Sequence, residues 1–327
     1  MSDPSRPLVF AFNGDADGLC AQHIYALEAG IPAARVTGWK RDVRLITRLP
    51  ALDAARIRVF DISLDQNREA LDPLLAKPAV DIEWYDHHEP GEAPVHPRLV
   101  LHINQAPGLC TAAIVDAALG RRHRDWAAMA AYGDNLPVTA EGILKDGGME
   151  PAQWSRLERA GILLNYNAYG DRPGDVLFEP ADLAARMSPF QSARDFCAEN
   201  SIFGPLQAQF DSDLERFQGL QALASGLTAR AYLVPDQAWA RRFAATWAND
   251  RIRTRPQEAL AMLHPRPDGT YLVSLRSPRV PGHPAPAASD LAREFPTGGG
   301  RKLAGGINRL PKEDLDRFLA RFVEFFS

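Results

Sequence analysis

Short apolar runs recur through the first third of the chain, each followed by polar residues. The runs cover Leu8–Phe12, Arg35–Trp39, Arg56–Ile62, Ile82–Tyr85 and Leu99–Ile103. A short apolar run between turn signals is typical of a strand buried on both faces of a parallel sheet. After the first run, Leu19, His23, Ile24 and Leu27 recur at helical spacing up to a stop at Gly30. This succession of strand, turn and helix predicts an α/β domain with a parallel sheet.

The pattern changes twice after these strands. Helices are predicted over Leu109–Leu119 and Trp126–Tyr132, and the pattern stays helical from Pro151 to about Phe217. A second alternation then predicts strands over Thr228–Val234, Glu258–His264 and Thr270–Arg276, and helices over Ala287–Phe295 and Lys312–Phe326. Since 327 residues exceed what one hydrophobic core usually serves, we expect two domains. We predict an N-terminal domain over residues 1–190, a helical connector over 191–225, and a smaller C-terminal α/β domain over 226–327.

Composition is that of an ordinary globular protein, with 46% hydrophobic and 24% charged residues. A net charge of −4 gives no global attraction to nucleic acid, so an anionic substrate must be held by local charge or by metal. Cys20, Cys110 and Cys197 lie far apart and match neither a zinc site nor a disulfide framework. This cysteine usage favours a reducing cytoplasm. No apolar run approaches membrane-spanning length.

Acidic and imidazole side chains follow several predicted elements at the point where each ends. Asp15 and Asp17 follow the first strand, Asp61 ends the third, Asp86-His87-His88 ends the fourth, and Asp134 follows an apolar helix. Open α/β sheets place their chemistry at the carboxyl ends of their strands, so we expect these side chains to converge. Imidazole suits manganese, iron or zinc, and carboxylates suit hard divalent cations. One imidazole can therefore bind a metal while the other faces substrate.

Each of these features also has a simpler explanation. Asp15 and Asp17 precede a helix and can cap it, and Asp-His-His can be a polar loop. Lys40, Arg41 and Arg44 could meet phosphate, but a solvated helix face is the favoured interpretation. A metal site is favoured because acidic or imidazole side chains recur at the ends of four separate segments. Two divalent ions about 3.5–4 Å apart can hold both the attacking and the leaving oxygen of an in-line displacement.

Taken in chain order, these residues resemble the motifs of the DHH phosphoesterases. The matching segments are Asn13–Gly18, Val59–Asp61, Asp86–His88 and Tyr132–Asn135. The C-terminal part is similar to the DHH-associated domain, whose two substrate-side motifs match Val273–Ser277 and Gly298–Arg301. The resemblance covers nearly the whole chain and is nearest to the oligoribonuclease and single-strand exonuclease branch. It implies a parallel-sheet DHH domain, a helical connector, and a substrate-binding domain, with the active site in the cleft between the two domains.

The resemblance also implies a metal centre. Two manganese ions, or magnesium or cobalt, would hydrolyse phosphodiester or phosphoanhydride bonds, and water between the ions would be the nucleophile. Asp15 and Asp61 would hold the first ion, and Asp17, Asp61, His87 and Asp134 the second. His88 would contact the scissile phosphate or assist the leaving group, and Asp86 would orient His87. The substrate-binding residues would be Ser274, Arg276, Gly298, Gly299, Gly300 and Arg301.

Three positions depart from the family pattern. Members commonly carry a histidine four residues, or an acid or histidine two residues, before the first motif aspartate, where this chain has Ala11 and Asn13. An amide oxygen can coordinate a hard cation, and we expect Asn13 to give the first ion a weaker site. Arg301 stands where the family's glycine-rich motif normally has histidine. Arginine keeps bidentate affinity for phosphate but cannot donate a proton at neutral pH.

These observations predict a manganese-dependent phosphoesterase that acts on a small nucleotide or a short oligonucleotide. A processive nuclease would be expected to show a longer basic and aromatic track along the strand. Two alternatives stay open: a phosphoanhydride hydrolase acting on pyrophosphate or short polyphosphate, and a catalytically weakened nucleotide-binding protein. We expect a cytoplasmic monomer or homodimer that has no membrane partner.

Overall fold

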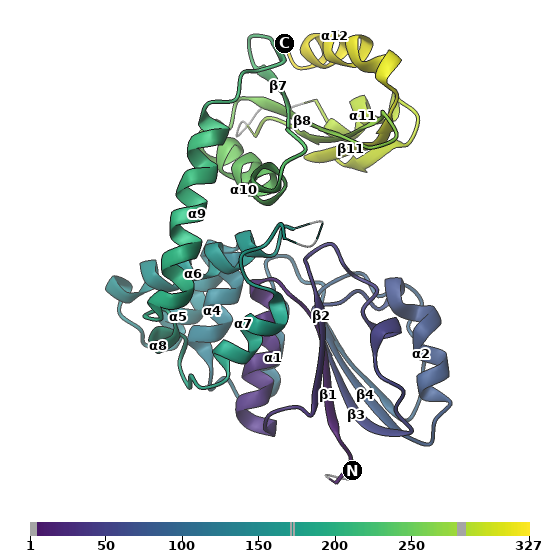
Figure 1. Cartoon of the computed structure of the whole chain (residues 1–327), viewed down its shortest axis with the longest axis vertical. Coiled ribbons are helices and arrows are strands. Elements are labelled where there is room, and N and C mark those ends of the chain that lie inside the picture. Colours follow the sequence, from purple (N-terminus) through teal and green to yellow (C-terminus); the bar gives the residue numbers. More distant parts are fainter. Residues whose placement is uncertain (1–4, 171, 173, 280–285) are drawn as a thin grey trace. The chain divides into compact units, whose positions relative to one another are not determined.

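The computed structural model describes residues 5–170, 172, 174–279 and 286–327. The chain divides into two compact units, Met1–Ala208 and Gln209–Ser327 (Figure 1). The division falls inside one helix, α9 (Asn200–Gln218). The three-part division with breaks after residues 190 and 225 stays a prediction.

The first unit contains a five-stranded sheet in the order β2-β1-β3-β4-β5, and every pairing in it is parallel. Its strands are β1 (Leu8–Asn13), β2 (Ala34–Gly38), β3 (Ala54–Phe60), β4 (Ala79–Asp86) and β5 (Leu99–Ile103). The predictions of an α/β fold with a parallel sheet and of these strands are confirmed. After β2 the chain returns to the other side of β1, so the strand order reverses between β1 and β3. In open α/β sheets, such a switch point is where ligands bind.

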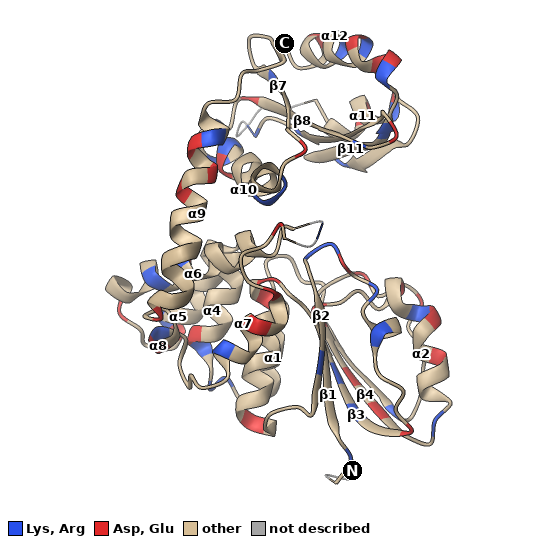
Figure 2. Cartoon of the chain, in the orientation of Figure 1, with Lys and Arg blue, Asp and Glu red and all other residues tan. Residues whose placement is uncertain are grey.

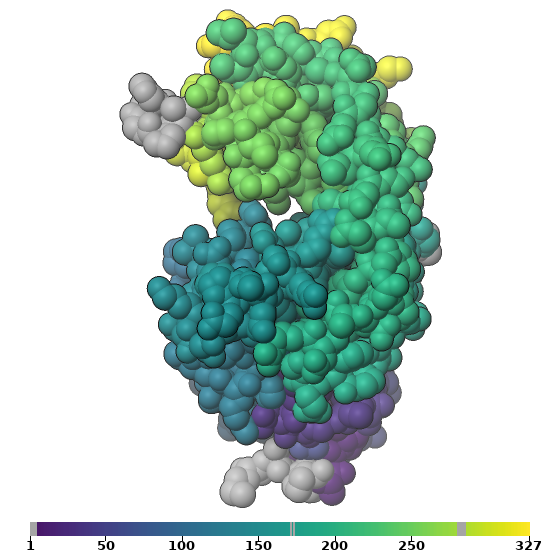
Figure 3. Space-filling view, turned by 90° about the vertical axis from the view of Figure 1, so that its left-hand side faces the viewer, coloured from purple at the N-terminus to yellow at the C-terminus, as the bar shows by residue number. Residues whose placement is uncertain are grey.

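Helices cover both faces of this sheet, with α1 and α4 on one side and α2 on the other (Figure 1). The helices are α1 (Ala16–Ala29), α2 (Arg68–Leu75), α3 (Thr111–Ala118), α4 (Arg124–Gly133), α5 (Pro137–Asp146), α6 (Trp154–Asn167), α7 (Pro180–Met187) and α8 (Ala193–Phe196). Three short 3₁₀ helices are η1 (Ile46–Arg48), η2 (Asp65–Asn67) and η3 (Pro151–Gln153). Figure 3 views the unit from the side of the teal and green helical segments, which form most of the surface visible there.

Alternation along the strands explains why both faces are apolar. On the α1 face, Tyr25 packs edge-on against Phe10, with ring centroids 5.7 Å apart. On the opposite face, Val9 and Ile57 join a buried cluster with Leu71 of α2. Successive strand residues point to opposite faces, so a strand buried on both sides must be apolar throughout.

The second unit is built on a six-stranded mixed sheet in the order β10-β11-β9-β8-β7-β6. Its strands are β6 (Ala224–Ser225), β7 (Ala229–Leu233), β8 (Ala259–Pro265), β9 (Tyr271–Arg276), β10 (Gly298–Arg301) and β11 (Ala304–Leu310). Its helices are α10 (Ala238–Thr254), α11 (Ala288–Arg293) and α12 (Leu315–Phe325), with a 3₁₀ turn η4 (Lys312–Asp314) before the last. The buried core includes Phe318 and Phe322 of α12, so its apolar stripe packs on the unit itself. The predicted second α/β region is confirmed.

Charge is mixed along the surface helices. Acidic and basic positions are interspersed along α9 and α12 (Figure 2). Within the described ranges, the structure contains no helix that is both long enough and apolar enough to span a membrane.

Candidate metal site

The predicted site residues of the first unit meet at the carboxyl edge of its sheet. Asp15 follows β1, Asp61 follows β3, and His87 follows β4, so they surround the switch point between β1 and β3. A pocket of about 460 Å³ opens there. Its lining residues are Asn13, Asp15, Lys40, Val43, Asp61, Ser63, Asp65, Gln66, His87, His88, Glu89, Gly91 and Asp134. The predicted convergence in this unit is thus present in the structure.

Two groups of ligand atoms lie close enough together to hold a divalent ion, and they share His87: one is Asp61, Asp86, His87 and His88, and the other is Asp17, His87 and Asp134. Asp17, His87 and Asp134 each offer one ligand atom, and these atoms lie within 4.8 Å of one another. Asp61 adjoins the group, since its Oδ1 lies 3.4 Å from Nε2 of His87. Carboxylate and imidazole ligands in this number fit a single manganese or similar ion. These four residues are the ones that the resemblance implies for the second ion.

The backbone at Asp61 is in the left-handed region, with φ of +56°. A non-glycine residue in this region is uncommon, and such strain persists only where the surrounding structure holds it. Here Thr111 contributes, because its hydroxyl donates a hydrogen bond of 3.2 Å to Asp61 Oδ1. The strained turn brings the Asp61 carboxylate to His87 directly after the strand ends.

Asp17 is fixed by the N-terminus of α3. Both of its carboxylate oxygens accept backbone N–H groups at 2.7 Å, one from Thr111 and one from Ala112. The positive end of a helix dipole also favours a carboxylate at this position. Asp17 is therefore held in one orientation before any ion binds, with lone pairs still available on both oxygens.

Burial and the charges of neighbouring carboxylates raise the pKa values of these acids. Burial, followed by the charge of Asp61, raises the pKa of Asp17 to about 7. Burial, followed by the charge of Asp15, raises the pKa of Asp61 to about 7, and burial with the charge of Asp17 does the same for Asp134. Several buried carboxylates without a compensating cation are expensive, and a divalent ion removes that cost. The donor set at this position fits a metal ion.

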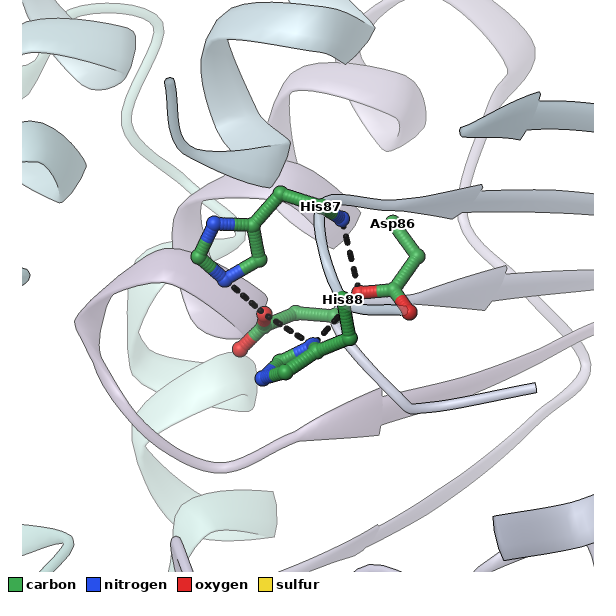
Figure 4. A group of neighbouring side chains, drawn as sticks. Asp86, His87 and His88 are labelled. Atoms are coloured by element: carbon green, nitrogen blue, oxygen red, sulfur yellow. Dashed lines mark hydrogen bonds and ion pairs between the residues drawn. The ribbon is translucent and has the colours of Figure 1, made fainter. Parts of the chain in front are cut away.

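The hydrogen bonds of Asp86, His87 and His88 differ from those that the resemblance implied (Figure 4). Nδ1 of the His87 ring lies 2.9 Å from the backbone oxygen of Leu109. Asp86 Oδ1 accepts the backbone N–H of His87 at 2.8 Å and lies 2.7 Å from Nδ1 of His88. The expectation that Asp86 orients the His87 ring is wrong, because a carbonyl oxygen occupies that position. Asp86 orients His88 instead.

The two imidazoles are both poised to carry positive charge. Burial opposes a charge on His87, but its hydrogen bond to Asp61 and the nearby carboxylates outweigh burial and raise its pKa to about 11. The hydrogen bond to fully buried Asp86 is the main cause that raises the pKa of His88. The His88 side chain is 46% exposed, so its ring reaches the pocket while its partner stays buried.

The position implied for the first ion is occupied by other contacts. Asp15 Oδ1 caps α1 by accepting the N–H groups of Asp17 and Gly18, at 3.0 and 3.1 Å. Asp15 Oδ2 is hydrogen-bonded to the ammonium group of Lys40. The amide oxygen of Asn13 accepts the backbone N–H of Asp15 at 3.3 Å. Asp15 therefore has the capping role weighed from the sequence, and the residues here do not fit a first metal ion.

Lys40 is not on a solvated helix face, as the sequence suggested, but lies in a turn after β2 and points into the site. Its ammonium group also donates to Asn165 Oδ1 at 3.1 Å and lies 3.5 Å from Asp134 Oδ1. Burial would lower the pKa of Lys40, but the Asp15 carboxylate outweighs burial and raises it well above its ordinary value. The same ammonium holds the pKa of Asp15 below its ordinary range, although burial alone would raise it.

The predicted substrate residues of the second unit share neighbouring rows of its sheet. Arg276 of β9 and Arg301 of β10 both pair with Ala304 of β11, one from each side. Ser274 and Gly299 both pair with Gly306 in the same way. Residues directly opposite in a ladder point to the same face, so the two arginines lie on one face of the sheet, two strands apart.

Two glycines of this segment are required by close packing. A Cβ on Gly298 would lie 1.7 Å from the backbone oxygen of Ala292. Gly300 has φ of +126°, and its Cβ would lie 2.6 Å from the oxygen of Ala304. These glycines let β10 approach its neighbours closely, and Arg301 follows them at the end of the strand.

Four residues of this site were missed or undervalued in the sequence: Lys40, Leu109, Thr111 and Asn165. Lys40 carried a usable signal, because it stands two residues after Gly38, at the carboxyl end of β2 and hence at the same edge as the acids. Leu109 acts through its backbone oxygen, so its side chain gives no signal. Asn165 lies within a helix, 125 residues from Lys40 in the sequence, and only the fold brings the two together.

No protein-family model matches the sequence, and a comparison with curated proteins finds no match. Solved structures do share the fold. A DHH domain described as belonging to a family of ribosomal proteins has a TM-score of 0.63 at 12% identity, covering 98% of this chain and 86% of that one. Exonuclease RecJ bound to manganese gives 0.57 at 17% identity, covering 98% and 90%. The pGpG-specific phosphodiesterase PggH from Vibrio cholerae gives 0.56 at 14% identity, covering 98% and 99%. The chain therefore has the fold of the DHH-domain proteins, as its sequence motifs predicted.

Proposed function

We propose that the chain is a divalent-metal-dependent phosphoesterase that hydrolyses a phosphodiester bond in a small nucleotide or a short oligonucleotide. The observation that carries the proposal is the convergence of Asp17, Asp61, His87 and Asp134 beside a pocket at the switch point of the sheet. An ion held there would lower the pKa of a coordinated water and neutralise charge on a phosphate group.

The charge of the pocket supports metal dependence. Its lining includes five acidic residues: Asp15, Asp61, Asp65, Glu89 and Asp134. Among the described residues that line the pocket, Lys40 is the single Lys or Arg, and it is already paired with Asp15. A phosphate group entering this pocket would meet net negative charge unless a cation were bound. The proposed ion supplies that cation.

His88 is the residue that we assign to the phosphate. Asp86 holds its Nδ1, which leaves Nε2 as the remaining polar atom of the ring. The raised pKa keeps the imidazole partly protonated near neutral pH, so it can donate a hydrogen bond to a phosphate oxygen or a proton to the leaving oxygen. His87 has a separate role, because its Nε2 faces Asp61 and the proposed ion.

Manganese is the ion that we propose. A mixed carboxylate and imidazole set suits manganese better than magnesium, which prefers oxygen ligands and retains several waters. One RecJ structure of similar fold is bound to manganese, and another is in complex with magnesium. At 17% identity this likeness supports the fold alone, so the ion must be identified on this chain.

A small substrate is supported by the pocket and by composition. A volume of about 460 Å³ lies within the range of small-molecule sites. The net charge of −4, and the interspersed acidic and basic positions along α9 and α12 in Figure 2, favour a small substrate over a long nucleic-acid strand. Arg276 and Arg301, which share one row of the second sheet, are proposed to bind the substrate's phosphate. The free cysteines accord with a cytoplasmic setting, which is part of the proposal.

Nucleotide binding without hydrolysis is a second candidate function, favoured by one observation. Lys40 engages Asp15, which the resemblance assigns to an ion, and this contact could weaken catalysis. The intact group of Asp17, Asp61, His87 and Asp134 argues for the enzyme instead.

The proposal is tested on metal-stripped protein restored with Mn2+, Mg2+ or Co2+ and offered a panel of phosphodiesters. The panel contains linear dinucleotides, short oligoribonucleotides and a chromogenic phosphodiester, with pyrophosphate and tripolyphosphate as phosphoanhydrides. The matched control is Asp17→Asn, which preserves size and removes a ligand charge; its folding is checked by thermal unfolding, because the new NH2 group would face one of the two backbone N–H groups that Asp17 accepts. We expect hydrolysis of a phosphodiester that is greatest with Mn2+ and is lost in Asp17→Asn.

Other results would redirect the assignment. Turnover of the phosphoanhydrides alone would replace the phosphodiesterase with a phosphoanhydride hydrolase. Binding of a dinucleotide without any turnover would favour the binding protein. Turnover as high as that of the Mn2+-loaded wild type, in both the stripped protein and Asp17→Asn, would show that the proposed metal site is not used.

A further inference from the structure

We infer that the ammonium group of Lys40 takes the place of one of two cations, so that this site binds a single divalent ion. The inference rests on the proposed metal-dependent function and concerns how many ions serve it. The motifs imply a first metal ion, but the residues present at that position do not fit one.

Lys40 is surrounded as a bound cation would be. Its ammonium group contacts carboxylate oxygens of Asp15 and Asp134 and the amide oxygen of Asn165. The ring of Tyr169 adds a cation–π contact at 5.6 Å from its centroid. An ammonium group has three donors and no acceptor, so three oxygens satisfy it fully. The oxygens that surround it come from segments far apart in the sequence.

Its position is fixed by the backbone as well. Lys40 N–H donates to the oxygen of Ala168 at 2.9 Å, and the amide of Asn13 donates to Lys40 oxygen at 3.4 Å. Asn13 thus turns its donor toward the lysine backbone and its oxygen toward Asp15 N–H. Both polar atoms of the Asn13 side chain therefore make hydrogen bonds, and the amide oxygen is held by the Asp15 backbone.

The buried carboxylates of the site are also neutralised without a second ion. Asp15 is 1% exposed and would be an unpaired buried anion if Lys40 were absent. A lysine in direct contact neutralises Asp15, whereas a dication bound at the same Asp15 carboxylate would be repelled by the adjacent ammonium group. The remaining acids, Asp17, Asp61 and Asp134, are then shared by one ion with His87. The Lys40 side chain keeps 26% exposure and lines the pocket.

The experiment counts bound Mn2+ per chain by calorimetric titration and reads the electron paramagnetic resonance spectrum of the loaded protein. Two Mn2+ ions about 3.5–4 Å apart would interact magnetically, whereas an isolated ion gives a resolved hyperfine pattern. Neither readout depends on turnover. We expect the wild type to bind one ion and to show the isolated pattern at saturating Mn2+.

Variants of Lys40 test the cause. Lys40→Arg keeps the positive charge and is expected to retain one ion. Lys40→Met keeps an unbranched stem, removes the charge, and is expected to gain a second, weaker ion with a coupled spectrum. Asn13→Asp combined with Lys40→Met adds a carboxylate and should tighten that second ion. Lys145→Met, at an exposed position of α5, is the control for removing a lysine and should bind one ion.

The ion at Asp17, Asp61, His87 and Asp134 serves as the internal control for folding, since a variant that keeps it has an intact site. Two ions in the wild type would overturn the inference and leave the proposed function standing. One ion in both Lys40→Met and the double variant would also overturn it, because Lys40 would not be what excludes the second. No ion in the wild type would sink the proposed function together with the inference.

Discussion

Nδ1 of His87 lies 2.9 Å from the backbone oxygen of Leu109. A carbonyl oxygen can only accept, so Nδ1 carries a proton and the opposite nitrogen, Nε2, faces Asp61 at 3.4 Å. This arrangement fixes the tautomer that a metal-ligating histidine needs. In the metal-free protein Nε2 is also protonated, since the pKa of His87 is raised to about 11. An ion that binds here would therefore replace the proton on Nε2, in a ring that is already oriented toward the proposed metal position.

His87→Ala should remove the proposed ion while leaving the fold intact. Loss of an outer-shell partner typically weakens metal binding by roughly 10–100-fold, and loss of the ligand itself should cost more. Calorimetric Mn2+ titration measures the affinity, with His123→Ala as control, because His123 pairs with Glu28 and does not line the pocket. Unchanged Mn2+ affinity in His87→Ala would remove His87 from the ligand set.

His88→Ala should leave metal affinity nearly unchanged and lower kcat by about 10²-fold or more, the range of a lost general acid. Asp86→Asn tests how His88 is positioned, since it keeps the size of the side chain and removes the charge that raises the His88 pKa. That pKa should fall toward its ordinary value, so activity should be lost mainly above pH 7. The measurement is the pH profile of kcat/KM, and a profile identical to the wild type would rule out this role for Asp86.

The sequence predicted the parallel sheet and the gathering of acids at its edge for one physical reason. The carboxyl ends of parallel strands lie together, so Asp15, Asp61 and His87 must meet if their strands are adjacent. The contact of Lys40 with Asp134 spans 94 residues and depends on how α4 packs, which no local pattern reveals. The Lys40 segment on its own has the composition of a solvated turn.

The second unit shows where local propensity misleads. Gly298–Arg301 and Ala304–Leu310 form two strands, although glycine is depleted in strands, because α11 passes too close for a side chain at Gly298. The pattern also predicted no helix for Ala238–Thr254, which forms α10. There the signal was present, since Phe243, Ala244 and Trp247 recur at helical spacing on its buried face. Interspersed arginines obscured it.

The metal-free protein should lose stability as pH rises from about 4 to about 7. The pKa values of Asp17, Asp61 and Asp134 are raised to about 7, against about 3.9 in an unfolded chain. Between these values the folded state holds protons that the unfolded state has released, so the free energy of unfolding falls with rising pH. His87 acts with the same sign, its contribution being complete below about 6.5 and lost as pH rises through about 11.

Mn2+ should reverse this loss, because it binds the deprotonated ligands. We expect the Mn2+-induced rise in Tm to be small at pH 5 and largest near pH 8, measured by thermal unfolding with and without the ion. Asp17→Asn should flatten the pH dependence of the metal-free protein. An equal rise in Tm at both pH values would contradict the assignment of these acids as ligands.

Arg276 and Arg301 are predicted to bind substrate from the second unit. Charge-assisted hydrogen bonds contribute about 1.5–3 kcal/mol, so truncating either to alanine should lower kcat/KM roughly ten-fold or more, mainly through KM. Bound Mn2+ should not change. Arg293→Ala is the control, since Arg293 is exposed on α11 and pairs with Asp290. An unchanged kcat/KM in both variants would mean that this row of the sheet does not contact substrate.

The most direct test of the metal-dependent phosphoesterase is the turnover of Asp61→Ala at saturating Mn2+. Asp61 contacts His87 and accepts a hydrogen bond from Thr111. His87 in turn offers its ligand atom together with those of Asp17 and Asp134. Loss of Asp61 should therefore remove metal binding and phosphodiester hydrolysis together. A thermal unfolding transition should show that the variant is still folded. Near-normal turnover of Asp61→Ala at saturating Mn2+ would contradict the metal-site assignment and the function built on it.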